Sequence, residues 1–231
     1  MRWLRWIPAS LLLISVCWAA ALYLGVAFSA HPADRPVKAF QFGSPLRISF
    51  VGTSLTASYD WPVHLNDCAD RSISVSRIAR AGAASDWGRR QADGIVANHP
   101  DVIFIEFSVN DADLRHRISL RESASNHRTL IRHLRARLPE ARIVLMTMSP
   151  AHGIRRILRP RLPAYYRLYR DLAEELDTGL LDIYPRWLAV PKPAREQQDG
   201  LHPSQTTASR IILPALGSYL GLTCQSETPA S

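Results

Sequence analysis

The chain has 231 residues, of which 47% are hydrophobic and 21% charged, and 28 basic residues against 20 acidic ones give it a net charge of +8. These values suit a globular protein and exclude a chain that is disordered throughout. The sequence contains no helix-turn-helix pattern, zinc finger or RNA-binding signature, so we expect no nucleic-acid partner. Two explanations of the charge stay open: an ordinary basic surface, or attraction to an anionic glycan or membrane surface.

The N-terminus carries an apolar segment. Residues 6–28 are uncharged and almost wholly apolar, a run long enough to span a bilayer as a helix. Arg2 and Arg5 precede it, so this end is expected in the cytoplasm and the following domain outside. We expect residues 1–30 to be an uncleaved signal anchor in the inner membrane, which predicts a periplasmic domain. A cleaved signal peptide, and hence a secreted protein, is the alternative.

One domain of about 200 residues fits the rest of the chain. Residues 31–45 contain prolines, charges and a glycine, and we interpret them as a linker. The domain is expected over residues 46–222, followed by a tail at 223–231. No internal repeat is present.

Strands and helices alternate along this domain. The hydrophobic pattern predicts strands at residues 46–51, 72–78, 101–107, 142–148 and 180–183. It predicts helices at residues 85–98, 119–138, 164–178 and 204–220. Alternation of this kind requires right-handed crossovers, and so it predicts a five-stranded parallel sheet between layers of helices, the α/β class. Ligands of such sheets bind beyond the carboxyl ends of the strands.

Residues suited to acyl chemistry follow those predicted strands. Ser54 follows the first strand and needs a base to become a nucleophile. His202 can act as that base, and Asp199 can hold its imidazole in the right tautomer. The backbone N–H groups of Ser54 and Gly82 and the amide of Asn110 can bind an oxyanion. We attribute the glycine at position 82 to a close approach of its N–H to the reacting carbonyl.

Structural roles for the same residues stay open. Ser54 can serve as a helix N-cap, Asn110 can bridge a turn, and Asp199 can be an exposed turn residue before a glycine. The sequence has no Gly-x-Ser-x-Gly elbow, which disfavours the α/β-hydrolase fold.

Four segments of the chain, which contain these residues, together resemble the four sequence blocks of the SGNH, or GDSL-like, hydrolase family, in order and at family-like intervals. The resemblance covers about residues 46–218. The matching positions are Gly-Thr-Ser-Leu-Thr at 52–56, Gly82, Asn110 with Asp111, and Asp199 with His202. Thr53 stands where the family commonly has Asp, and Ser108 where a glycine often opens the third block.

This resemblance implies a flavodoxin-like three-layer α/β/α sandwich and a serine esterase that uses an acyl-enzyme and neither metal nor cofactor. We expect small acyl esters as substrates, for example O-acetyl groups on an extracellular polysaccharide. Acyl transfer to a glycan, lipase or thioesterase activity, and a non-catalytic carbohydrate-binding protein stay open as alternatives.

Two further sets of residues are candidates for a role. Arg155, Arg156 and Arg159, with Trp61, are candidates for a substrate-binding rim; a solvated basic loop and core packing are the alternatives. Cys68 and Cys224 are candidates for a disulfide, with two free thiols as the alternative. No Cys-x-x-Cys pair occurs, so neither a zinc ribbon nor a redox dithiol is supported.

Overall fold

The computed structural model describes residues 31–37, 44–68, 72–191, 197 and 199–222. Within them, five parallel strands form one sheet in the order β2-β1-β3-β4-β5. The strands are β1 (Leu46–Gly52), β2 (Ile73–Ala79), β3 (Val102–Glu106), β4 (Arg142–Thr147) and β5 (Gly179–Asp182). This order is that of the flavodoxin-like doubly wound fold, so the predicted fold class is confirmed.

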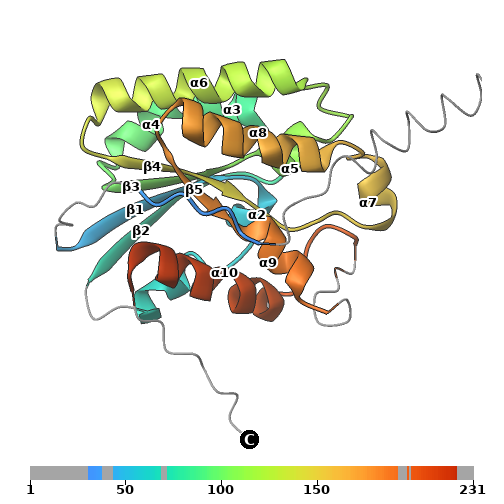
Figure 1. Cartoon of the computed structure of the whole chain (residues 1–231). Coiled ribbons are helices and arrows are strands. Elements are labelled where there is room, and N and C mark those ends of the chain that lie inside the picture. Colours follow the sequence, from blue (N-terminus) through green and yellow to red (C-terminus); the bar gives the residue numbers. More distant parts are fainter. Residues whose placement is uncertain (1–30, 38–43, 69–71, 192–196, 198, 223–231) are drawn as a thin grey trace, which may run out of the picture.

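Helices cover both faces of the sheet. They are α2 (Ser54–Ala57), η1 (Val63–Cys68), α3 (Ser85–Arg90), α4 (Ala92–Ala97), α5 (Ser108–Asp111), α6 (Leu120–Arg137), α7 (Gly153–Ile157), α8 (Leu162–Glu175), α9 (Ile183–Ala189) and α10 (Gln205–Leu220). Helices α3, α4, α6 and α8 lie over one face and α10 over the other, as Figure 1 shows. Every residue of β3 is buried, as expected for a central strand covered on both sides.

Most element boundaries agree with the prediction to within two or three residues. Helix α6 begins after Ser119, whose hydroxyl accepts from the N–H of Glu122 at 3.1 Å, as expected of an N-cap residue. The single helix expected over residues 85–98 is instead two short helices that meet at Gln91. The short helices α7 and α9 were not predicted, because neither is long enough to display a helical period.

Part of the predicted linker is packed against the sheet. Arg35 forms an antiparallel bridge with Leu180 of β5, with both N–H···O distances at 2.9 Å. Its side chain reaches Asp177, and its carbonyl accepts from the hydroxyl of Tyr219. Strand β5 lies at the edge of the sheet, so residues 31–37 occupy backbone groups that an edge strand would otherwise expose.

Across the residues that the structure describes, we find no helix with the length and apolar character needed to cross a membrane. The apolar run at residues 6–28 lies outside that part of the chain, so the signal anchor stays a prediction.

Candidate active site

Three neighbouring strands end level with one another at the carboxyl edge of the sheet. Gly52, the last residue of β1, pairs with Ala79 of β2 on one side and with Glu106 of β3 on the other. The segments that follow these strands therefore start side by side. The direction of chain progression reverses between β1 and β3, and this is the position where doubly wound folds bind ligands.

Ser54 is the first residue of α2, directly after β1. Thr53 caps this short helix, accepting the N–H of Leu55 with its hydroxyl at 3.2 Å. The first N–H groups of a helix have no partner within it, so the backbone N–H of Ser54 points out of the helix start. The Ser54 side chain is almost buried and faces His202, with 2.8 Å between Oγ and Nε2.

His202 and Asp199 come from a tight loop before α10. Asp199 Oδ2 lies 2.8 Å from His202 Nδ1, and Oδ1 accepts the N–H groups of His202 and Leu201 at 2.7 and 2.9 Å. Partial burial alone would raise the pKa of Asp199, but these bonds outweigh it and hold the pKa well below its usual range. Asp199 is therefore ionised, and Ser54, His202 and Asp199 form one continuous chain of hydrogen bonds.

Asn110 lies in α5, immediately after β3. Its Nδ2 donates to the carbonyl of Ala83 at 2.8 Å, which brings the amide to the loop that follows β2. In that loop Gly82 has a φ of +74°, a conformation that favours glycine. A Cβ at position 82 would meet no protein atom within 4 Å, so this backbone angle, and not crowding by the protein, explains the glycine.

Glu106, the last residue of β3, is hydrogen-bonded to the segment that carries Ser54. Its carboxylate accepts the N–H of Thr53 at 2.6 Å, the hydroxyl of Thr53 at 3.0 Å and the hydroxyl of Thr56 at 2.8 Å. Burial raises the pKa of Glu106 to about 7, although these hydrogen bonds lower it. A Cβ at Gly52 would lie 2.2 Å from Glu106 Oε1, so glycine is required where the strand passes this carboxyl group.

An open pocket of ≈ 290 Å³ lies over the hydrogen-bonded chain. It is lined by Ser54, Ser58, Tyr59, Ala81 and His202. The serine hydroxyl and the imidazole are therefore accessible to a ligand, and the volume suits a small group. Within the described residues no cluster of three or more His, Cys, Asp or Glu side chains could hold a metal ion.

The sequence model of the GDSL-like Lipase/Acylhydrolase family matches residues 40–208, which is most of the chain. This protein belongs to that family. It is therefore an SGNH-type ester hydrolase, and the family resemblance of its four sequence blocks is confirmed.

Relatives of this GDSL-like hydrolase include both curated proteins and solved structures. Thioesterase 1/protease 1/lysophospholipase L1 of Escherichia coli is 26% identical over 155 residues, covering 67% of this chain and 71% of that protein. The structure of Axe2, an acetylxylan esterase from Geobacillus stearothermophilus, superposes with a TM-score of 0.66 at 20% identity and covers 81% of this chain and all of that one. A lipase/acylhydrolase from Enterococcus faecalis gives 0.66 at 20% identity, covering 78% of this chain and 98% of that one. The two structures show that the fold is shared.

Two residues predicted for the substrate rim of this GDSL-like hydrolase lie elsewhere. Trp61 is fully buried, packs edge-on against Phe50 and donates its indole N–H to the carbonyl of Leu55 at 3.0 Å. Arg159 is also buried, with its guanidinium 2.7 Å from Asp113 Oδ2 and 2.7 Å from the carbonyl of Val109. Both side chains thus support the site from within, and the rim prediction is wrong for them.

The other two arginines lie on α7. Arg156 is exposed, as a rim residue would be. Arg155 is half-buried and donates to Asp199 Oδ2 at 2.8 Å, so it contacts the hydrogen-bonded chain itself. Sequence analysis did not anticipate this ion pair, because the two residues are far apart in the chain.

Glu106 was also missed, although a signal existed. It is the only charged residue between Val102 and Phe107, a stretch otherwise composed of apolar residues. A charge in a central strand needs a specific partner. The proposed pair of Cys68 and Cys224 includes a residue outside the described part of the chain and stays a prediction.

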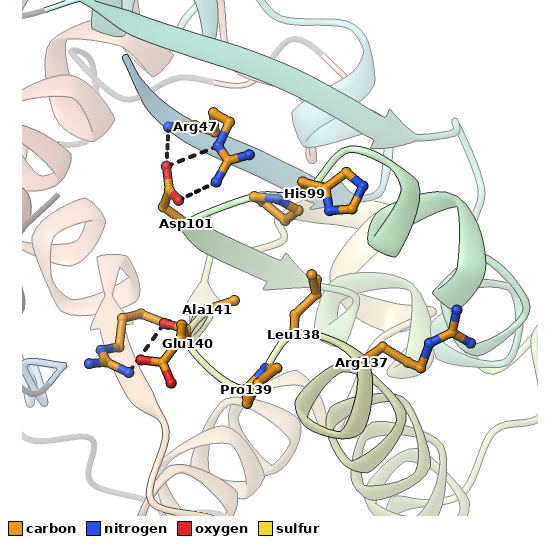
Figure 2. Close-up of a pocket in the computed structure, with 10 residues that line it drawn as sticks. Arg47, His99, Asp101, Arg137, Leu138, Pro139, Glu140 and Ala141 are labelled. Atoms are coloured by element: carbon orange, nitrogen blue, oxygen red, sulfur yellow. Dashed lines mark hydrogen bonds and ion pairs between the residues drawn. The ribbon is translucent and has the colours of Figure 1, made fainter. Parts of the chain in front are cut away.

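A second cavity of the described structure lies away from the serine. It has a volume of ≈ 520 Å³ and is lined by residues that include Arg47, His99, Asp101 and Arg137 (Figure 2). Arg47 is the second residue of β1 and Asp101 precedes β3, so this cavity lies at the amino edge of the sheet, opposite the edge that carries Ser54.

Proposed function

We propose that this GDSL-like hydrolase is a serine esterase of the periplasm that removes small acyl groups, such as O-acetyl groups, from an extracellular polysaccharide. The observation that carries the catalytic part is the hydrogen-bonded chain from Ser54 through His202 to Asp199, with contacts of 2.8 Å at both steps. It lies in a pocket that a small acyl ester can enter.

In the first half-reaction, Ser54 Oγ attacks the ester carbonyl carbon while its proton passes to His202 Nε2. Asp199 holds the imidazole through Nδ1 and stabilises the imidazolium that forms. The negative oxygen of the tetrahedral intermediate accepts hydrogen bonds from the N–H groups of Ser54 and Gly82 and from Asn110 Nδ2. The intermediate then expels the alcohol, which takes the proton from His202, and leaves an acyl-serine.

In the second half-reaction, His202 removes a proton from water, and the resulting nucleophile attacks the acyl carbon. Expulsion of Ser54 Oγ, which recovers its proton from His202, releases the carboxylic acid. An acceptor sugar hydroxyl in place of water would make the same machinery an acyltransferase. The chemistry on the protein side is identical in both cases.

The proposed substrate and location have separate supports. The pocket of ≈ 290 Å³ can accommodate a short acyl group, and an acetylxylan esterase shares the fold. The apolar run at 6–28 with Arg2 and Arg5 before it supports an anchored domain outside the inner membrane. The E. coli relative, named as a thioesterase and lysophospholipase, makes hydrolysis of acyl thioesters or lysophospholipids the second candidate.

A fluorophosphonate probe tests the nucleophile. We expect wild-type protein to be labelled at Ser54 and the Ser54→Ala variant to remain unlabelled and to lose p-nitrophenyl acetate hydrolysis. A wild-type protein that does not react at Ser54 would instead fit the non-catalytic carbohydrate-binding alternative.

Substrate and location need their own measurements. Initial rates on acetylated xylan fragments, lysophospholipids and acyl thioesters compare the candidate substrates, and product analysis with an added sugar acceptor separates transfer from hydrolysis. Cell fractionation of chains with and without residues 1–30 tests the anchor. We expect the full chain in the membrane fraction and the shortened chain outside it.

A further inference from the structure

Helix α7 (Gly153–Ile157) and the residue before it pack against the loop that carries Asp199 and His202. The N–H of His152 donates to the carbonyl of Gly200 at 2.7 Å. Gly200 has a φ of +79°, and a Cβ there would lie 2.5 Å from the carbonyl oxygen of His152. The two segments are thus in direct backbone contact, which sets the distance between α7 and the loop.

One oxygen of Asp199 joins the helix to the imidazole. Oδ2 accepts from Arg155 Nη2 at 2.8 Å and faces His202 Nδ1 at 2.8 Å, while Oδ1 accepts two backbone N–H groups of its own loop. Among the described residues, Arg155 thus donates to this carboxylate a hydrogen bond that comes from outside the loop. Its side chain is 28% exposed, so solvent screens this pair less than a fully exposed one.

We propose that Arg155 is a positioning residue of the reaction, which holds Asp199 against His202 and opposes the positive charge of the protonated imidazole. This inference rests on the proposed function, in which His202 is the general base. Arg155 need not touch the substrate. It acts through Asp199, and for this reason it differs from the rim arginine that the sequence suggested.

The electrostatic part follows from the geometry. Both contacts meet at Oδ2, so the guanidinium lies within about 6 Å of the imidazole. A fixed positive charge at this distance disfavours a second one on His202, which keeps the imidazole in the neutral form that accepts the serine proton. The carboxylate of Asp199 favours a positive charge on His202, and the guanidinium of Arg155 partly offsets this effect.

Other titratable groups near this pair must be separated from Arg155. Tyr59 lines the pocket beside His202, and burial, with the charge of Asp199, raises its pKa to about 12, so it stays neutral near pH 7. His152 belongs to the segment packed on the loop. Glu106, with a pKa of about 7, accepts the N–H of Thr53, the residue before Ser54. His152 and Glu106 are therefore the two neighbouring groups that need control variants of their own.

The test is the pH dependence of kcat/KM for a soluble ester, measured on the full chain in detergent. We expect Arg155→Ala to move the midpoint of the acid limb upward by roughly 0.5 pH unit or more, because the imidazole then protonates more easily. Arg155→Lys keeps the charge and should leave the midpoint within about 0.2 pH unit of the wild type. Arg132→Ala removes a positive charge from the exposed side of α6, and its midpoint should not move.

A purely structural role for Arg155 predicts a different pattern. In that case Arg155→Ala would lower the plateau of kcat/KM without moving the limb, and this result would overturn the proposal. The variants His152→Gln and Glu106→Gln identify which group produces the limb. If Arg155→Ala does not fold, Arg155→Gln, which keeps a hydrogen-bond donor without the charge, takes its place.

A measurement without turnover separates this inference from the proposed function. NMR titration of the imidazole of His202 gives its pKa in wild type and in Arg155→Gln, whether or not the protein hydrolyses an ester. An upward shift in the variant supports the proposal. An unchanged pKa of His202 rejects it, even in an active enzyme, whereas loss of the proposed function would appear as an unreactive Ser54.

Discussion

Arg159 donates a hydrogen bond from Nη2 to the side-chain oxygen of Asn110 over 3.4 Å. A guanidinium has only donors, so this contact determines which end of the amide is the oxygen. The amide nitrogen is then directed to the carbonyl of Ala83, at 2.8 Å, and thus to the loop that contains Gly82. A buried arginine therefore orients the side chain that we assign to the oxyanion.

Replacing Arg159 with Met should destabilise the protein and slow catalysis. The substitution removes a buried cation next to Asp113, whose side chain is fully buried, and such a loss typically costs about 3 kcal/mol of unfolding free energy. We expect kcat to fall more than KM rises, because the amide loses its orientation. Urea unfolding and steady-state kinetics measure the two effects. Arg132→Met, on the exposed side of α6, is the control and should change stability by less than about 0.5 kcal/mol.

Asn110→Ala should lower kcat about 100- to 1000-fold with little change in KM, because an oxyanion donor acts mainly in the transition state. Labelling of Ser54 by a fluorophosphonate should also slow down, since that reaction develops similar charge. A decrease in kcat of less than tenfold would mean that Asn110 serves the turn alone and does not contact the oxyanion.

Glu106 should make stability depend on pH. Its pKa is raised in the folded protein from 4.5 to about 7, so the folded state binds more protons than the unfolded state between these values. Its contribution is therefore fully present below about pH 4.5 and is lost as the pH rises to about 7. We expect Glu106→Gln to gain stability relative to wild type over this window. Urea unfolding of both proteins at several pH values measures the difference, and a constant difference would contradict the assignment.

Gly200→Ala should disrupt the catalytic loop. The added Cβ would lie 2.5 Å from the backbone oxygen of His152, at a φ of +79° that disfavours alanine. We expect a large loss of kcat/KM and a lower melting temperature. Gly94→Ala is the matched control, because Gly94 lies inside α4 with nothing within 4 Å of a new Cβ. That variant should gain up to about 1 kcal/mol in stability and keep its activity.

The fold and the central residues of the site could be predicted from the sequence. Alternating strands and helices determine a parallel sheet, and the residues that follow parallel strands must lie on one edge. The positions of Ser54 and Asn110 in the segments that follow β1 and β3 are local features that need no knowledge of packing. Asp199 and His202 are three residues apart, and so their contact within one loop also follows from local sequence.

The roles of the arginines and of Glu106 were decided only by the tertiary structure. Arg155 and Arg159 lie in the same basic stretch, yet one reaches Asp199 and the other is buried against Asp113 and Asn110. A sequence pattern reports charge and periodicity within a few turns of chain, and it contains no distance between separate loops. Partners far along the chain meet only when the helices pack on the sheet, and the burial that raises the pKa of Glu106 arises in the same step.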